Sequence, residues 1–129
     1  MTKSSSLQHL CAVLLFFVAT SITSDSQTFK TLANLSSETG VDPQASLVQG
    51  RDGNFYGTTP EEGSGGAGTV FKITRAGKLT TIYNFCSLAN CADGSAPGSA
   101  LVLAPDGTFY GTTSLGGASQ AGTIFKASP

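Results

Sequence analysis

Apolar and polar residues alternate along several short stretches of this chain, and Gly-rich segments separate the stretches. Alternation with a period of two residues predicts β-strands, because successive strand side chains point to opposite faces of a sheet. No stretch shows a convincing helical period. The pattern therefore predicts an all-β fold with strands at 45–49, 54–59, 68–74, 79–85 and 99–103, followed by second copies of 54–59 and 68–74.

The strand pattern occurs twice because the sequence itself is repeated. The segment Asp-Gly-Asn-Phe-Tyr-Gly-Thr-Thr at 52–59 recurs as Asp-Gly-Thr-Phe-Tyr-Gly-Thr-Thr at 106–113, which is 54 residues further on. The same spacing relates 67–72 to 121–126. A repeated unit with an open apolar face must stack on a neighbour to bury that face. Two repeat cores, 43–85 and 97–126, thus form one predicted domain that spans residues 25–129.

Each complete unit reads as four antiparallel strands. Asp52-Gly53 and Arg75–Lys78 are turn signals, since Gly adopts a positive φ without steric cost. On the fourth strand we expect Leu79, Thr81, Tyr83 and Phe85 to share one face and Ile82 to lie on the other. Apolar residues on both faces indicate a sheet covered on both sides. Four-stranded units of this length predict a β-propeller-type fragment of about two blades.

The strand order is circularly shifted. Residues 29–35 align with 79–85 at a spacing of 50, so the chain reads as a fourth strand, then strands one to four, then strands one to three. The change of spacing from 50 to 54 indicates a four-residue insertion between Phe85 and Pro97. Cys86 and Cys91 lie in this enlarged loop.

The first 24 residues have a different character. Lys3 precedes the apolar run 10–19, and small polar residues follow it. This pattern is typical of a secretory signal peptide, and the run is shorter than the ~20 residues of a membrane span. The competing interpretation is a buried strand or helix. We therefore expect residues 1–24 to be a signal peptide, the mature chain to have no stable membrane span, and the protein to be extracellular, periplasmic or at the cell surface.

Removal of this segment would leave Cys86 and Cys91 as the only cysteines and would remove His9, the only histidine. An even pair of cysteines in an exported protein favours a disulfide. The alternative is a metal site, but two thiolates fall short of the four ligands of structural zinc. We expect no metal and no cofactor.

The repeated residues resemble a known bacterial repeat. Asp-Gly-Asn-Phe-Tyr-Gly-Thr-Thr followed by Gly-Thr-Val-Phe-Lys-Ile is similar to the GloVer (Gloeo/Verruco) tandem repeat, which occurs in long exported or surface proteins. Phe85-Cys86 and Cys91-Ala92-Asp93-Gly94 resemble a variant of that repeat with a cysteine-bearing loop. The resemblance implies a propeller-like array in an extracytoplasmic protein, and it carries over no catalytic residue.

Composition narrows the classes of partner. A net charge of −1 and a charged fraction of 12% provide no basic surface for nucleic acid or an anionic membrane. Without histidine, the usual activator of serine and cysteine nucleophiles is missing. We expect a secreted or surface β-repeat module with a structural or ligand-binding role. The alternative is a fragment of an extracellular propeller enzyme, a lyase or glycan hydrolase, whose catalytic residues lie outside this chain.

Several motifs have both a chemical and a structural interpretation. Asp52-Gly53 and Asp106-Gly107 fit hairpin turns better than calcium loops, which need six to eight oxygen ligands. The Gly-rich stretch 63–68 precedes a strand, whereas phosphate loops precede a helix. Glu61 and Glu62 are adjacent carboxylates, but neighbours on one loop are not placed across a substrate as glycosidase carboxylates are. For each of these motifs, the structural interpretation is favoured over the functional one.

The order of strands also predicts where a ligand would bind. Strand direction alternates, so loops 60–67, 114–121, 36–44 and 86–98 should emerge at one rim, which holds Glu61, Glu62, Asp42 and Asp93. Binding residues concentrate on loops held by a rigid scaffold, so Glu61, Glu62 and Asp93 are the candidate ligand-binding residues. Two blades leave outer sheet faces without a neighbour, which predicts self-association or packing against further repeats.

Overall fold

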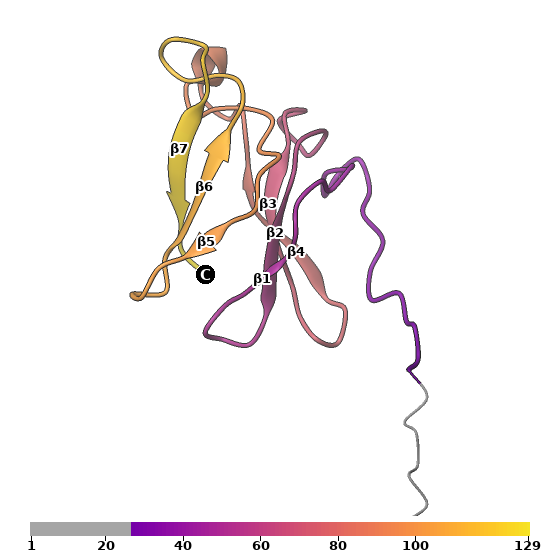
Figure 1. Ribbon diagram of the computed structural model, residues 1–129. Helices are drawn as coiled ribbons and strands as arrows, with labels where there is room; N and C mark the ends of the chain where they lie inside the picture. The colour runs from indigo at the N-terminus through magenta and orange to yellow at the C-terminus, as the bar shows by residue number, and fades with distance from the viewer. Residues whose placement is uncertain (1–26) are drawn as a thin grey trace, which may run out of the picture.

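A computed structural model describes residues 27–129, so the predicted signal peptide lies outside the described residues. The fold is all-β, as the alternating pattern predicts, with two antiparallel sheets that lie side by side (Figure 1). The first sheet has the order β1-β2-β3-β4 and the second the order β5-β6-β7. Their bounds are β1 Val48–Gln49, β2 Phe55–Thr59, β3 Thr69–Ile73, β4 Leu79–Asn84, β5 Val102–Leu103, β6 Phe109–Thr113 and β7 Thr123–Ala127.

Asp-Gly turns connect the first two strands of each sheet. Gly53 adopts a φ of 77° and its N–H donates to the carbonyl of Gly50 at 3.0 Å. Asp52 Oδ1 accepts a hydrogen bond from the backbone N–H of Asn54 at 3.1 Å. Asp106 and Thr108 repeat this contact at 2.9 Å. The Asp carboxylates therefore stabilise hairpins, as the Asp-Gly pairs predict.

The first strand of each sheet is shorter than predicted. Only Val48 and Gln49 pair with β2, whereas the expected strand covered 45–49. Upstream, the chain turns away and Val41 forms a bridge with Glu61 instead. The alternation of apolar residues continues beyond the paired backbone, so it overestimates the length of the strand.

A β-bulge changes the faces of β4. Val70 pairs with Tyr83, but the next residue, Phe71, pairs with Thr81, so Ile82 is an extra residue. Thr81 therefore lies on the Phe71 face and Tyr83 on the Val70 face. The expectation that Leu79, Thr81, Tyr83 and Phe85 share one face is wrong, because a bulge reverses the alternation of side chains in the middle of the strand.

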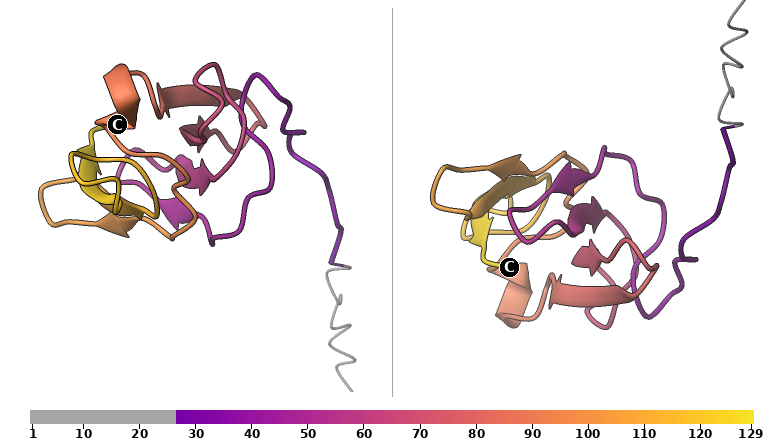
Figure 2. Two further views of the ribbon diagram at one scale, coloured as in Figure 1. Left: turned by 90° about the horizontal axis from the view of Figure 1, so that it is seen from above. Right: turned by 90° about the horizontal axis from the view of Figure 1, so that it is seen from below.

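The core lies between the two sheets. Its buried apolar residues come from both repeats and comprise Tyr56, Val70, Phe85, Leu101 and Phe109. The rings of Tyr56 and Phe109 have centroids 4.3 Å apart. Views from above and below show the sheets as neighbouring layers, with the N-terminal segment outside the first sheet (Figure 2). One repeat thus buries its apolar face on the other, as repeat architectures require.

Two segments differ from the predicted strand inventory. Residues 29–35, expected to resemble a fourth strand, are in no strand, so seven strands are found among residues 27–129 where eight were predicted. The inserted loop contains a short 3₁₀ turn, η1 Ala89–Cys91. Within residues 27–129, no helix has the length and apolar character needed to cross a membrane.

Candidate binding rim

The long loops of both repeats meet at one end of the sheets. We call loops 36–44, 60–67, 86–98 and 114–121 the loop rim, which is at the top of Figure 1. Short bridges tie these loops together within each repeat, Val41 to Glu61 and Ser95 to Leu115. The backbone N–H of Ala96 donates to the carbonyl of Ala67 at 2.8 Å and joins the two repeats. The predicted convergence of these loops is therefore present.

The base of the loop rim is a repeated threonine pair. Thr59 Oγ1 and Thr69 Oγ1 are 2.8 Å apart, and the same distance separates Thr113 Oγ1 from Thr123 Oγ1. A glycine with a positive φ packs on each pair, Gly40 at 94° and Gly94 at 97°. A Cβ atom on Gly40 would be 1.9 Å from Thr59 Oγ1, and one on Gly94 would be 2.5 Å from Thr113 Oγ1. Only glycine fits both positions, so the loops leave the sheets along the same path in both repeats.

The inserted loop is held by a disulfide and by Asp93. Cys86 and Cys91 are bonded, as the cysteine pair predicts. Asp93 Oδ2 accepts hydrogen bonds from the Tyr83 hydroxyl at 2.8 Å and from the Ser87 N–H at 3.0 Å, and Oδ1 accepts one from the Leu88 N–H at 3.2 Å. Burial raises the pKa of Asp93, but these hydrogen bonds outweigh it and lower the pKa below its usual value. Asp93 therefore has a structural role in this loop.

The two adjacent glutamates have a different setting. Both Glu61 and Glu62 are exposed, and their contacts are made by the backbone. Val41 N–H donates to the Glu61 carbonyl at 3.0 Å, and Gly68 N–H donates to the Glu62 carbonyl at 2.8 Å. The backbone is thus fixed while both carboxylates face solvent. Of the three candidate residues, these two are free to contact a ligand without loss of a structural hydrogen bond.

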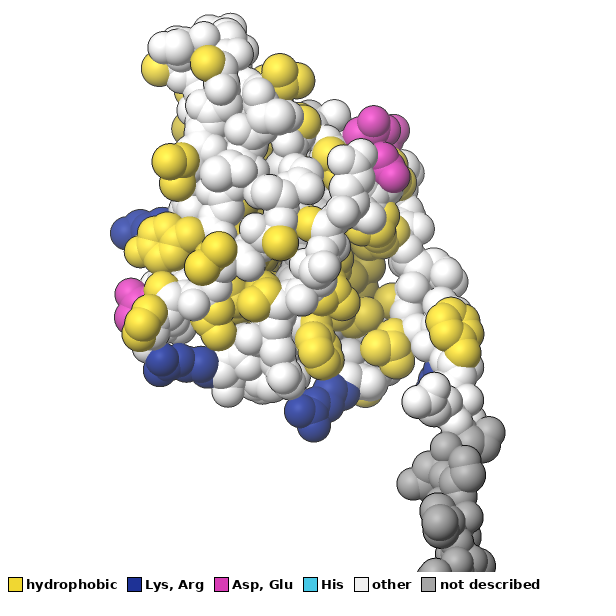
Figure 3. Space-filling view, in the orientation of Figure 1, with side chains coloured by type: hydrophobic (Ala, Val, Ile, Leu, Met, Phe, Trp, Pro, Cys, Tyr) yellow, Lys and Arg dark blue, Asp and Glu magenta, His cyan; other side chains and the backbone are white. Residues whose placement is uncertain are grey.

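Charge is distributed unevenly between the two ends of the sheets. The loop rim contains Glu38, Asp42, Glu61, Glu62 and Asp93 and no Lys or Arg. Arg51, Arg75 and Lys78 lie in the turns at the opposite end. Asp52 and Asp106 also lie in turns at that end. Figure 3 shows only acidic charges near the top of this face, and basic side chains with an acidic patch beside them toward its lower end. A ligand at the loop rim would therefore meet a negative potential.

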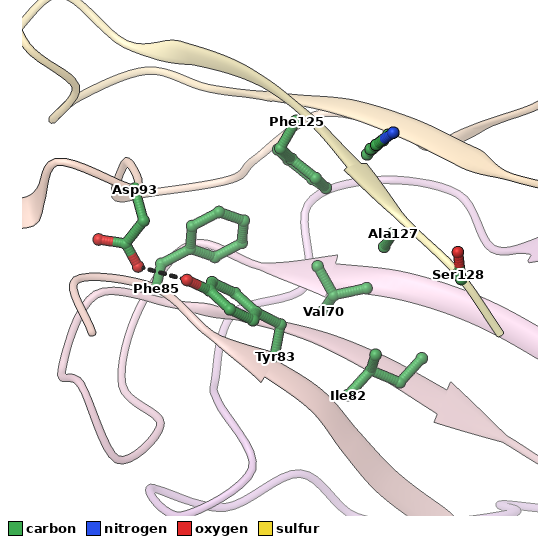
Figure 4. A pocket seen from close by; sticks show the side chains of 9 residues that line it. Val70, Ile82, Tyr83, Phe85, Asp93, Phe125, Ala127 and Ser128 are labelled. Atoms are coloured by element: carbon green, nitrogen blue, oxygen red, sulfur yellow. Dashed lines mark hydrogen bonds between the residues drawn. The ribbon is translucent and has the colours of Figure 1, made fainter. Parts of the chain in front are cut away.

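A cavity separates the two repeats below the disulfide loop. Figure 4 shows Tyr83 and Asp93 at one end and apolar side chains of β3, β4 and β7 along the rest. Burial, together with Asp93, raises the pKa of Tyr83, whereas the pKa of Asp93 is lowered. Both shifts move away from neutral pH, whereas acid–base catalysts need a pKa near the working pH. The hydrogen-bonded pair of Tyr83 and Asp93 therefore has a structural role beside this cavity, and it is poorly suited to proton transfer.

A polar groove at the loop rim was not anticipated from the sequence. It lies between the repeats and is lined by Gln44, Pro60, Ala96, Gly98, Ser99, Thr112, Thr113 and Ser114. Thr58 Oγ1 donates to the carbonyl of Ser99 at 3.0 Å, and the hydroxyl oxygens of Ser99 and Thr112 are 2.9 Å apart. Small hydroxyl residues have no periodic signal, so only the packing of the repeats reveals that they share one groove.

Within 27–129, no group of three or more His, Cys, Asp or Glu side chains is arranged to hold a metal ion. The carboxylate of Asp52 instead accepts hydrogen bonds from the Tyr56 hydroxyl at 2.7 Å and the Asn54 side chain at 2.6 Å. The bond from Tyr56, followed by that from Asn54, lowers the pKa of Asp52.

Comparison with known proteins identifies a family of repeats that this sequence matches. The sequence model of the Gloeobacter/Verrucomicrobia repeat matches residues 18–129, which is most of the chain and includes both repeats and the disulfide loop. No match was found among curated proteins.

Proposed function

Because the chain belongs to the Gloeobacter/Verrucomicrobia repeat family, we propose that it is an exported β-repeat module that builds a stacked array and presents its loop rim to a ligand or partner. The observation that carries this proposal is the convergence of four loops, two from each repeat, at one end of a rigid pair of sheets. Loops that are variable in sequence but fixed at their bases are the usual location of binding residues.

Export is supported by two features. Residues 1–24 have the charge and hydropathy pattern of a signal peptide, and the Cys86–Cys91 disulfide suits an oxidising compartment. In a bacterial host that expresses the chain, we expect it outside the cytoplasm, with a mass reduced by the leader and with both cysteines oxidised. Full-length protein with three alkylatable thiols, confined to the cytoplasm, would contradict export.

Ligand binding at the loop rim is tested with charge substitutions at the two ends of the sheets. An array of glycans and peptides serves as the probe, since it assumes no ligand class. The variant Glu61→Gln/Glu62→Gln removes two exposed carboxylates from the loop rim. The control Arg75→Gln/Lys78→Gln removes two exposed charges at the opposite end. We expect the first variant to bind any captured ligand about tenfold more weakly and the control to bind it normally.

Asp93 is left unchanged in this test, because its substitution would disturb the disulfide loop as well as the charge of the rim. Equal binding by both variants, or equal loss in both, would show that the loop rim is not the contact surface. A chain that captures nothing on the array would count against a binding role and leave the structural role.

A further inference from the structure

The second sheet turns an apolar face away from the first. Three of its side chains, Val102, Tyr110 and Ile124, are 65%, 41% and 83% exposed. In the first sheet, the residues at the same repeat positions are Val48, Tyr56 and Val70, which pack in the core between the sheets. The exposed face of the second sheet therefore consists of the same kinds of residue that the first sheet buries against the following repeat.

The outer face of the first sheet provides the complementary surface. Residues 33–35 cross it, and Leu35 lines a cavity with Phe71 and Ile73 of β3. The equivalent residues at the interface between the repeats are Phe85, Phe125 and Ala127, which line the cavity shown in Figure 4. Phe85 and Phe125 are in edge contact, with ring centroids 5.0 Å apart. The two cavities are thus the same site of the repeat, found at two successive interfaces.

One side chain distinguishes the two cavities. Val70 lines the cavity between the repeats and is fully buried there. Among residues 27–129, no side chain takes the place of Val70 in the outer cavity. The residue at the position of Val70 in the second repeat is Ile124, which is exposed. Ile124 of another copy is similar in size to Val70 and occupies the equivalent position in its sheet. It therefore fits the position in the outer cavity that corresponds to that of Val70.

The strand edges are also complementary. β3 pairs with β4 on its outer side, but among the described residues no strand pairs with the outer edge of β7, the equivalent of β3. Residues 29–35 match β4 in sequence position, yet they are in no strand. The outer edge of β7 therefore has backbone donors and acceptors without a strand partner. Residues 29–35, which are equivalent to β4 in the repeat, have backbone groups that pair with no strand of the described chain and can complement this edge.

We propose that copies of this chain associate head to tail by strand complementation. Residues 29–35 of one copy pair antiparallel with β7 of the next and become the fourth strand of its second sheet. Val102, Tyr110 and Ile124 of that sheet then pack on the outer face around Phe71 of the first copy. The contact repeats the interface already present between the two sheets of one chain, so it continues the array across copies. Such a head-to-tail contact closes into a ring if its rotation allows.

The register follows from the first sheet. Val70 pairs with Tyr83 between β3 and β4. The repeat spacing of 54 carries Val70 to Ile124, and the spacing of 50 carries Tyr83 to Ala33. Ala33 of one copy should therefore lie opposite Ile124 of the next. Asn34, the adjacent residue, points its side chain to the other face of the strand.

This proposal rests on the array-building part of the proposed function and not on binding at the loop rim, so the two can fail separately. Chains with Ala33→Cys are mixed with chains with Ile124→Cys under a glutathione redox buffer, and Cys11 is replaced by Ser in both. We expect a covalent heterodimer in which mass spectrometry finds the two peptides linked, because paired strand residues are within disulfide reach.

The matched control mixes Asn34→Cys with Ile124→Cys. It should give about tenfold less heterodimer, since the two side chains point to opposite faces. No heterodimer from the Ala33 pair, or equal yields from both pairs, would overturn the proposed register and strand exchange. Ala33 is half-buried and Ile124 exposed, so neither substitution should prevent folding.

Light scattering of the purified chain gives an independent measurement. We expect an assembly larger than a monomer, and Ile124→Asp should dissociate it. Leu115→Asp introduces the same charge at an exposed leucine of the loop rim and should leave the assembly intact. A well-folded monomer at all concentrations, or equal dissociation by both variants, would overturn the proposal.

Discussion

At the scale of single residues, Tyr56 shows how the packing of the repeats changes the chemistry of a side chain. Its ring is fully buried against Phe109, and its hydroxyl donates to Asp52 at 2.7 Å. Tyr110 occupies the same position in the second repeat and is 41% exposed. Identical local sequence therefore produces a core residue in one repeat and a surface residue in the other. The difference arises entirely from what covers each sheet.

The environment of Tyr56 predicts alkaline sensitivity. Burial, together with the neighbouring Asp52, raises the pKa of Tyr56 from 10.0 to about 12. A raised folded-state pKa contributes stability that is present below pH 10 and is lost as the pH rises toward 12. We expect the free energy of unfolding in urea to fall across this range. Tyr56→Phe should have a shallower decline, although loss of the hydrogen bond costs about 1 kcal/mol at neutral pH.

The control for this prediction is Tyr110→Phe, because that ring is exposed. It should keep the decline of the unmodified protein. An equally steep loss of stability with Tyr56→Phe would show that another group causes the alkaline transition.

At the scale of elements, each Phe-Tyr-Gly-Thr-Thr strand needs its central glycine because an aromatic ring of the neighbouring strand packs against the backbone at that position. A Cβ atom on Gly57 would be 2.6 Å from Phe71 Cζ, and one on Gly111 would be 2.4 Å from Phe125 Cζ. Both distances are below normal contact, so the ring of the third strand lies directly on the backbone of the second. The glycine is therefore explained by packing between neighbouring strands, and no ligand is required to explain it.

The two glycines should differ in their tolerance to substitution. Gly111→Ala pushes Phe125 toward Phe85 in the interface between the repeats, where both rings are confined. Overpacking of this kind costs about 1–3 kcal/mol. Gly57→Ala pushes Phe71 toward the open outer cavity, so it should be milder. Urea unfolding of the two variants measures the difference, and a larger effect at Gly57 would contradict this account.

At the scale of the whole molecule, the two repeats share one core. The buried cluster draws Tyr56, Val70 and Phe85 from the first repeat and Leu101 and Phe109 from the second. Phe71 and Ile73 are also buried, but they lie on the outer face of the first sheet and outside this cluster. The repeats should therefore unfold together and not one after the other.

Truncation of the shared core tests this cooperativity. Phe109 is 1% exposed, and Phe109→Ala should lower the free energy of unfolding by about 3–5 kcal/mol. Tyrosine fluorescence and hydrogen exchange in both sheets should report one coincident transition. Ile124→Ala removes a comparable apolar side chain from the exposed face and should change the stability of a dissociated monomer by less than about 0.5 kcal/mol. Separate transitions for the two sheets would contradict a shared core.

The sequence alone determined the all-β class, the two repeats, the Asp-Gly hairpins, the cysteine pair and the end at which the long loops meet. These features depend on local rules, namely the two-residue period of a strand, the positive φ available to glycine, and the spacing of identical motifs. Gly40 and Gly94, which obey the same spacing of 54 outside the predicted repeat cores, could also have been found in this way.

Only the tertiary structure decided which of two equivalent faces is buried, because burial depends on what lies next to a sheet and not on its own sequence alone. It also showed the bulge at Ile82, the short β1 and β5 strands and the absence of strand pairing for residues 29–35. From its residue type alone, Asp93 is indistinguishable from a solvent-facing carboxylate of the loop rim. Only its three hydrogen bonds reveal a structural role. These features depend on contacts between residues distant in sequence, which periodicity does not encode.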